Sequence, residues 1–258
     1  MVIGLEYQGQ GFYGWQAQPR LATLQGCVEA ALSEIAAHPV RAHAAGRTDR
    51  GVHAGLQIVH FDTDANRPPN AWVRGVNHLL PETVAVLWAQ PVSPDFHARF
   101  SAYARHYRYI LLNHPIRSAL MAGRVGWCHR PLDIEAMRGA AKSLLGEHDF
   151  SCFRSRQCQA KSPFKTIYRL TLERYAELIV IDISANAFLH HMVRNIVGAL
   201  IFIGQGRQPA SWLTYLLETK DRRCAAPTFM ADGLYFLGAD YPAPFKLHYA
   251  TYRRHYLC

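Results

Sequence analysis

Apolar and polar residues recur along this chain at the spacings of short strands and amphipathic helices. In the first hundred residues the pattern predicts four strands, with one helix after the first strand and another before the last. The predicted strands cover residues 1–7, 39–44, 57–61 and 84–88, and the helices follow Thr23, a good N-cap, and Pro68-Pro69. This part of the chain therefore reads β-α-β-β-α-β.

The rest of the chain carries a second set of strands and helices of similar size. The predicted segments are a tyrosine-rich strand (100–113), a helix (133–145), a basic loop (150–164), two strands (165–175 and 178–184), two helices (189–204 and from 212) and a closing strand (234–237). We predict an α/β (α+β) fold with two similar subdomains, 1–101 and 102–258. They are expected to form one mixed, mainly antiparallel sheet with helices on its outer faces and an active-site cleft between the halves.

The charge of the chain is concentrated in its middle. Half of the 258 residues are hydrophobic and 18% are charged, which favours a folded protein, and the formal net charge is +9. Residues 99–174 contain 14 Lys and Arg against 5 Asp and Glu, whereas the segments before and after are close to neutral. Basic residues interleaved with Tyr, Phe and His indicate a phosphate-backbone partner. A basic protein without such a partner fits the composition equally well.

Several classes of protein are disfavoured by what the sequence lacks. The six cysteines form no C-x-x-C pair and no zinc-ligand spacing, and neither a Walker loop nor a G-x-G-x-x-G after a strand is present. No secretory signal opens the chain, and no apolar run reaches membrane-spanning length. We therefore expect a cytoplasmic protein with reduced thiols that uses no metal and no cofactor and does not enter a membrane.

The polar loop between the second and third predicted strands reads A-G-R-T-D-R-G-V-H-A. Its one carboxylate, Asp49, lies between Arg47 and Arg50, and glycines on both sides allow sharp turns. Neighbouring guanidinium groups keep a carboxylate ionised, and an ionised carboxylate on a loop can act as a nucleophile. A solvated turn with a surface ion pair is the alternative for so short a cluster.

A second polar string, F-H-A-R-F-S-A followed by R-H-Y-R-Y, lies at the start of the tyrosine-rich strand. Alternate strand residues share a face, so Arg105, Tyr107 and Tyr109 are expected to face one way and the residues between them the other. An aromatic ring beside an arginine suits a flipped base, which needs a stacking surface and a phosphate contact. A half-buried strand with tyrosine in the core would show the same pattern.

A third string, A-N-A-F-L-H-H-M-V-R-N-I-V-G, places Arg194 in an apolar helix. A buried arginine is costly unless a carboxylate, a phosphate or backbone carbonyls pair with it, and the favoured carboxylate is Asp49. The adjacent histidines His190 and His191 are of metal-ligand type, although such pairs at a helix start more often cap or pack. A fourth string, G-L-Y-F from residue 233, reads as a core strand.

In this order the four strings resemble the signature sequences of the tRNA pseudouridine synthases of the TruA family. The resemblance covers about residues 1–241, and the tail 242–258 matches no family pattern. It implies isomerisation of uridine to pseudouridine at positions 38–40 of the tRNA anticodon stem-loop, with base flipping. The N-glycosidic bond breaks, the uracil rotates and a C–C bond forms at C5. The resemblance also implies a homodimer.

The resemblance assigns roles to particular residues. Asp49 would be the nucleophile, attacking the ribose C1′ or the base C6 or acting through a glycal intermediate. Arg47 would hold Asp49, Arg194 would pair with it, and Tyr107 would stack on the base. The resemblance also places Leu234 in the wall of the uracil pocket. Apart from the resemblance, we expect substrate contacts from Arg105, Arg50, His53 and Arg154, and contacts with the stem from Phe12, Tyr13, Trp15 and the loop 154–165. Arg50 departs from the family, where many members have a small residue.

Two other classes of function share some of these features. A metal-dependent hydrolase would use His43, Asp49, His53 and His60, but no second carboxylate lies among them and no helical H-x-x-x-H is present. An RNA-binding module without chemistry would account for the basic middle. It leaves the arginine-flanked Asp49 and the arginine of the apolar helix unexplained.

Overall fold

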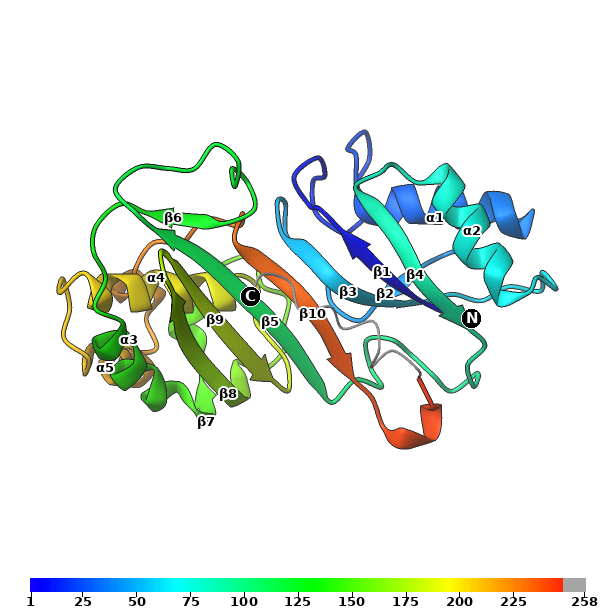
Figure 1. Ribbon diagram of the computed structural model, residues 1–258. Coiled ribbons are helices and arrows are strands. Elements are labelled where there is room, and N and C mark those ends of the chain that lie inside the picture. Colours follow the sequence, from blue (N-terminus) through cyan, green and yellow to red (C-terminus); the bar gives the residue numbers. More distant parts are fainter. Residues whose placement is uncertain (248–258) are drawn as a thin grey trace. The chain divides into compact units, whose positions relative to one another are not determined.

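The computed structural model describes residues 1–247, and its chain forms two compact units (Figure 1). The first unit comprises residues 1–105 and 235–247, and the second comprises residues 106–234. The division into subdomains 1–101 and 102–258 stays a prediction, and part of the tail, residues 248–258, lies outside the described residues. Within residues 1–247 no helix has the length and apolar character needed to cross a membrane.

The first unit has the predicted β-α-β-β-α-β order. Its elements are β1 (Val2–Tyr7), α1 (Leu24–Ala36), β2 (His43–Ala44), β3 (His53–His60), α2 (Pro69–Leu79) and β4 (Val84–Gln90), with β10 (Leu234–Asp240) and the 3₁₀ turn η4 (Ala243–Phe245). Strand β1 pairs antiparallel with β3 and β4, and β10 pairs parallel with β3. Helix α1 begins where predicted, because Thr23 Oγ1 accepts a hydrogen bond from Gly26 N. Helices α1 and α2 pack together beside these strands (Figure 1).

The strand predicted for residues 39–44 is only two residues long. Side chains of α1 accept hydrogen bonds from the backbone N–H groups that would pair in a longer strand. Val40 N donates to Ser33 Oγ, at 2.9 Å, and Ala42 N donates to Glu29 Oε1, also at 2.9 Å. These side-chain bonds satisfy the backbone locally and leave β2 as His43–Ala44.

The tyrosine-rich strand begins at Ala104 rather than Phe100, because His97 holds a turn before it. The ring nitrogen Nδ1 of His97 accepts from the backbone N–H groups of Arg99 and Phe100. Ser101 N donates to the His97 carbonyl, at 2.9 Å. The strand, β5 (Ala104–Asn113), follows this turn and carries the chain into the second unit.

The second unit contains the rest of the predicted elements and two additional short strands. Its elements are β6 (Gly126–Cys128), α3 (Ile134–Ala141), η1 (Lys142–Leu144), β7 (Gly146–Asp149), η2 (Ser151–Phe153), β8 (Phe164–Tyr175), β9 (Leu178–Ala185), α4 (Met192–Gly204), α5 (Trp212–Thr219) and η3 (Arg222–Cys224). The predicted helix 133–145 ends at Ala141 and continues as a 3₁₀ turn. Strands β6 and β7 were not predicted, because three or four residues are too few to show an alternation.

The ten strands hydrogen-bond in the order β4-β1-β3-β10-β5-β9-β8-β7, with β2 paired to β3 and β6 to β5. Strand β1 with β3 and β4, β2 with β3, and β8 with β7 and β9 pair antiparallel, whereas β10 with β3 and β5 with β6 pair parallel. This confirms the predicted α/β class with one mainly antiparallel sheet. Helix α4 is buried along almost its whole length, as its apolar sequence predicts. The cleft expected between the halves stays a prediction.

Candidate active site

The loop 45–52, here called the signature loop, is anchored from beneath by buried polar groups. Thr48 is buried, and its Oγ1 lies 2.8 Å from the Tyr7 hydroxyl. Gln57 Nε2 donates to the same hydroxyl, at 3.3 Å, and to Gly46 O, at 2.7 Å. Burial raises the pKa of Tyr7 to about 12, against the opposing effect of these hydrogen bonds, so its hydroxyl stays neutral. The anchor is therefore a set of neutral, satisfied groups.

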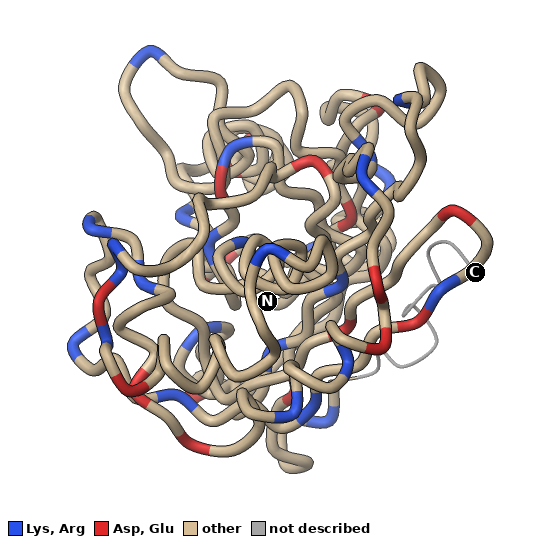
Figure 2. The backbone as a smooth tube through the Cα atoms, turned by 90° about the vertical axis from the view of Figure 1, so that its left-hand side faces the viewer, with Lys and Arg blue, Asp and Glu red and all other residues tan. Residues whose placement is uncertain are grey.

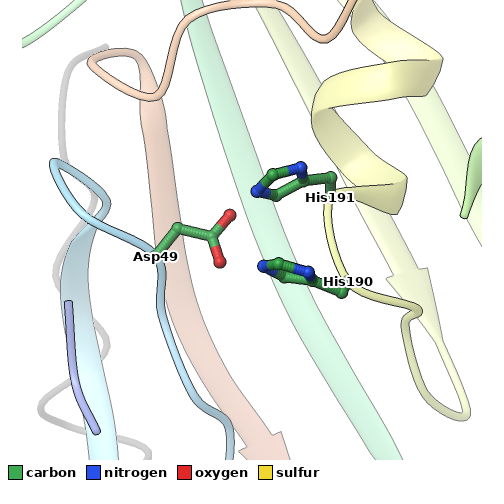
Figure 3. A group of neighbouring side chains, drawn as sticks. All are labelled: Asp49, His190 and His191. Carbon is green, nitrogen blue, oxygen red and sulfur yellow. The ribbon is translucent and has the colours of Figure 1, made fainter. Parts of the chain in front are cut away.

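Asp49 lies at the turn of the signature loop. Its carbonyl accepts from Val52 N, at 3.1 Å, and Gly51 takes a φ of 81°, in the left-handed region. Figure 3 shows the half-buried carboxylate projecting from this loop. The side chains of Arg47 and Arg50 are exposed. The sequence thus folds as predicted into a sharp turn that presents its only carboxylate.

A glycine-rich segment, residues 8–15, packs directly on the signature loop. A Cβ on Gly9 would lie 2.1 Å from Val52 O, and one on Gly14 would lie 2.8 Å from Thr48 O. Gly14 also has a φ of 86°. Trp15 N donates to Thr48 O, at 2.9 Å. The two loops approach so closely that only glycine fits at these two positions.

His53, at the start of β3, is held inside the first unit. Its side chain is 2% exposed, its Nδ1 accepts from Gly9 N, at 3.2 Å, and its ring stacks on Tyr235 with centroids 4.7 Å apart. This burial gives His53 a packing role. Its expected contact with substrate stays a prediction.

Two of the histidines considered for a metal site accept hydrogen bonds from backbone N–H groups. His60 Nδ1 accepts from Ala98 N, at 3.1 Å, and His53 Nδ1 is occupied by Gly9 N. Within either unit taken by itself, no three His, Cys, Asp or Glu side chains among residues 1–247 bring their ligand atoms within 4.8 Å of one another. The set His43, Asp49, His53 and His60 is therefore not gathered into a metal site.

Strand β5 presents Tyr107 and Arg105 in different surroundings. The half-buried ring of Tyr107 meets Phe188 edge to face, with centroids 5.0 Å apart. The Arg105 guanidinium donates to the backbone carbonyls of Ala102, at 2.8 Å, and Arg99. Arg105 therefore stabilises the turn that precedes the strand.

The residues on either side of Tyr107, which were expected to face the opposite way, contact β9. His106 Nδ1 lies 2.7 Å from Ser184 Oγ. Arg108 makes a bidentate ion pair with Asp182, with N···O distances of 2.8 and 2.9 Å. These polar pairs hold β5 against β9.

Arg194 lies in the first turn of α4 and is half-buried. Its Nε donates to the carbonyl of Phe229, at 2.8 Å, and Phe229 N donates back to the Arg194 carbonyl, at 3.3 Å. A backbone carbonyl was one of the partners that the sequence left open. The predicted pairing with Asp49 stays a prediction.

The turn before α4 is hydrogen-bonded to residues 154–165, which are called the basic loop from here on. His190 and His191 have ring centroids 4.0 Å apart (Figure 3) and His191 has a φ of 65°. Ser155 N donates to His190 O, at 3.0 Å, and His190 N donates to Cys158 Sγ, at 3.3 Å. Sequence reasoning missed the role of Cys158, because a single cysteine outside a motif gives no signal.

Arg154 shapes the basic loop from within. Its Nη2 donates to the carbonyls of Cys158 and Ala160, both at 2.8 Å. The buried Lys165 similarly donates to the carbonyls of Ser162 and Phe164, and burial lowers its pKa. Arg154 and Lys165 both donate hydrogen bonds to backbone carbonyls of this loop. A contact of Arg154 with substrate stays a prediction.

The remaining candidate residues differ in exposure. Leu234, at the start of β10, is buried. Phe12 and Trp15 are also buried, whereas the Tyr13 ring is 43% exposed. Figure 2 marks the Lys and Arg positions along the backbone. In the second unit the exposed ones from the basic middle of the sequence are Arg117, Arg124, Arg130, Lys142, Arg156, Lys161, Arg169 and Arg174.

Comparison with known proteins gives matches over most of the chain. A sequence model of the family described as tRNA pseudouridine synthase matches residues 5–101 and 140–242. The tRNA pseudouridine synthase A of Chromobacterium violaceum is 57% identical over 248 residues, covering 96% of this chain and 95% of that protein. The protein of the same name from Dechloromonas aromatica is 58% identical over 241 residues, covering 93% and 92%.

Among solved structures, a chain of the crystal structure of a Cbf5-Nop10-Gar1 complex aligns with a TM-score of 0.39 and 11% identity. The alignment covers 94% of this chain and about half of that chain, 49%. So weak a likeness supports no inference. The family match and the identities above are decisive: the chain belongs to the tRNA pseudouridine synthase family and is an isomerase.

Proposed function

We propose that this protein isomerises uridine to pseudouridine at positions 38–40 of the tRNA anticodon stem-loop, with Asp49 as nucleophile and the target base flipped out of the stack. The reaction breaks the bond between C1′ and N1 and forms one between C1′ and C5. The C5 proton is lost, and N1 gains a proton. Atoms and electrons balance without a redox partner or a group donor.

The observation that carries the proposal is the way the signature loop holds Asp49. The Tyr7–Thr48–Gln57 anchor fixes the loop from beneath, and the turn at Gly51 leaves the Asp49 carboxylate projecting from it. A nucleophile held in advance loses little freedom when substrate arrives. A neutral anchor also adds no charge that would compete for the carboxylate.

The other site residues have supporting roles in the proposal. Tyr107, braced edge to face by Phe188, would stack on the flipped uracil and assist proton transfer at C5. Arg194, oriented through the Phe229 carbonyl, would pair with Asp49 and keep it ionised. Arg47 would fill the space that the flipped base vacates. Leu234 would contribute an apolar wall of the uracil pocket.

The experiment that tests this function uses an unmodified tRNA transcript with uridine at one of positions 38–40. Wild-type protein should form pseudouridine at that position and not elsewhere in the molecule. A transcript with cytidine at these positions is the matched control and should remain unmodified. Pseudouridine only outside the anticodon stem-loop, or none at all, would contradict the proposal.

We also propose that the protein acts in the cytoplasm as a homodimer and without a metal. The dimer should appear in light scattering as twice the chain mass of 29.2 kDa. Turnover should persist in excess chelator once the tRNA has been folded. A stable, fully active monomer would contradict the first expectation. Loss of turnover that a trace of divalent metal restores would contradict the second.

A further inference from the structure

The residue after Asp49 makes a contact that the roles above do not use. The guanidinium carbon of Arg50 lies over the ring of Tyr13, 4.4 Å from its centroid. Both side chains are exposed. We propose that this Tyr13–Arg50 pair binds a backbone phosphate of the RNA beside the reacting nucleotide, an inference that rests on the proposed function.

Hydrogen bonds hold the backbone of the residue that carries the aromatic ring. Tyr13 N donates to Ala22 O, at 2.8 Å, and Tyr13 O accepts from Gln18 Nε2, at 3.2 Å. The next residue, Gly14, packs on the signature loop so closely that its Cβ position lies 3.2 Å from Arg50 N. The backbone segments that carry the ring and the arginine are therefore held next to each other.

The cationic half keeps its hydrogen-bonding capacity. Within residues 1–247, no carboxylate forms an ion pair with Arg50 and no hydrogen bond occupies its guanidinium, unlike Arg108, which is bound at two nitrogens by Asp182. Stacking uses the flat face of a guanidinium and leaves the N–H groups at its edge available. Those groups match a phosphate in a bidentate arrangement.

The surrounding charge makes this arginine distinctive. Residues 1–98 contain 6 Lys and Arg against 8 Asp and Glu, so this part of the chain carries no general basic surface. An arginine stacked on a ring next to the proposed nucleophile would attract a phosphate in a segment that otherwise carries slightly more acidic than basic residues. Because stacking on the Tyr13 ring already restricts the guanidinium, binding should cost less conformational entropy than it would for an arginine without such a contact.

The test measures tRNA affinity of the full chain over a series of KCl concentrations. Replacing Arg50 by Ala should weaken binding about 5- to 10-fold at low salt and reduce the log–log salt slope by about one unit. The matched control is Arg74→Ala, which removes another exposed arginine, from α2 in the same unit. That variant should change neither quantity measurably. Equal slopes and affinities for the two variants would overturn the proposal.

Conservative variants separate the charge from its support. Arg50→Lys should keep the salt slope while losing part of the affinity, because lysine cannot make the bidentate contact. Tyr13→Phe should bind like wild type, since the ring remains. Tyr13→Leu should weaken binding with little change of slope, because the charge remains but loses its platform. Wild-type affinity in Tyr13→Leu would also overturn the proposal.

The same experiments distinguish this inference from the proposed function. If wild type forms pseudouridine but Arg50→Ala matches the control, the phosphate contact is wrong and the function stands. If wild type binds tRNA with an Arg50-dependent slope but forms no pseudouridine, the function is wrong and the contact stands. In kinetics, Arg50→Ala should raise KM more than it lowers kcat.

Discussion

The side-chain amide of Asn195 joins α4 to the residue that precedes the basic loop, with Nδ2 donating to the carbonyl of Phe153 at 2.7 Å. The same amide accepts through Oδ1 from Arg222 Nη2, at 3.1 Å, and from Thr228 Oγ1, at 2.7 Å. Asn195 is fully buried. Asn195, the residue after Arg194, is therefore bonded to Thr228, which precedes the residue whose carbonyl orients Arg194.

We expect Asn195→Leu to destabilise the protein by about 1–3 kcal/mol, because the carbonyl of Phe153 and the guanidinium of Arg222 lose a buried partner. The measurement is the free energy of unfolding from denaturant titration. Gln159→Leu, which removes an exposed amide in the same unit, should have an effect within about 0.5 kcal/mol. Equal stabilities of the two variants would show that the Asn195 bonds contribute nothing.

We expect Asp49→Asn to lose pseudouridine formation at least roughly a thousandfold while still binding tRNA. The amide keeps the size of the side chain, so the loop should fold, but it cannot act as the nucleophile. Phosphate contacts come from arginine and lysine, so affinity should survive. Product yield and affinity are measured at the same salt concentration. Substantial product from a verified Asp49→Asn protein would refute the mechanism.

We expect Gly14→Ala to destabilise the first unit by more than about 1 kcal/mol and to reduce activity. The left-handed φ and the nearby Thr48 carbonyl both oppose a side chain there, so the signature loop must shift. Gly11→Ala is the matched control in the same loop, because a Cβ at that position meets nothing within 4 Å. Thermal unfolding and turnover of the two variants should differ clearly. A Gly14→Ala protein as active as Gly11→Ala would be inconsistent with close packing of the loops.

We expect stability to fall as pH drops below about 6.5, partly through His60. Burial and the neighbouring His97 and His43 lower the pKa of His60 from 6.5 to about 4, against the opposing effect of Asp62. Between pH 6.5 and about 4, His60 is therefore protonated in the unfolded chain but neutral in the folded chain. The contribution is fully present above pH 6.5 and is lost progressively towards pH 4.

The check is the free energy of unfolding between pH 7.5 and 4.5. His60→Gln should show a shallower decline than wild type, because its amide oxygen can still accept from Ala98 N but does not titrate. His78→Gln, at an exposed position near the end of α2, should decline like wild type. Parallel curves for all three proteins would remove His60 from the explanation.

Sequence reasoning predicted most elements because their signals are local. Thr23 as N-cap, the apolar spacing of α1 and the alternation of β8 and β9 each depend on neighbours in the chain. The errors came from side-chain hydrogen bonds to the backbone, which leave no trace in the apolar and polar pattern. The strand predicted for residues 39–44 was too long because Ser33 and Glu29 of α1 accept hydrogen bonds from its N–H groups. The strand predicted for residues 100–113 was too long because His97 holds a turn at its start.

In the candidate site, too, some features could be predicted from the sequence and others could not. The turn that presents Asp49 could be predicted from its flanking glycines. The Tyr7–Thr48–Gln57 anchor could not, because it joins two strands and a loop that are far apart in sequence. The tie between Cys158 and His190 was missed for the same reason. Their residue types carry no motif, and only the folded backbone brings them together.

The parallel pairing of β10 with β3, where Tyr235 stacks on His53, also has a consequence for biosynthesis. A ribosome releases the strand that follows the signature loop long before it releases its neighbour in the sheet. Until residues 235–240 emerge, the start of β3, at His53 and Ala54, has one open edge and His53 lacks the ring that covers it. The first unit to be synthesised should thus be the last to complete its folding, and nascent chains truncated before Tyr235 should expose an edge available to chaperones or to aggregation.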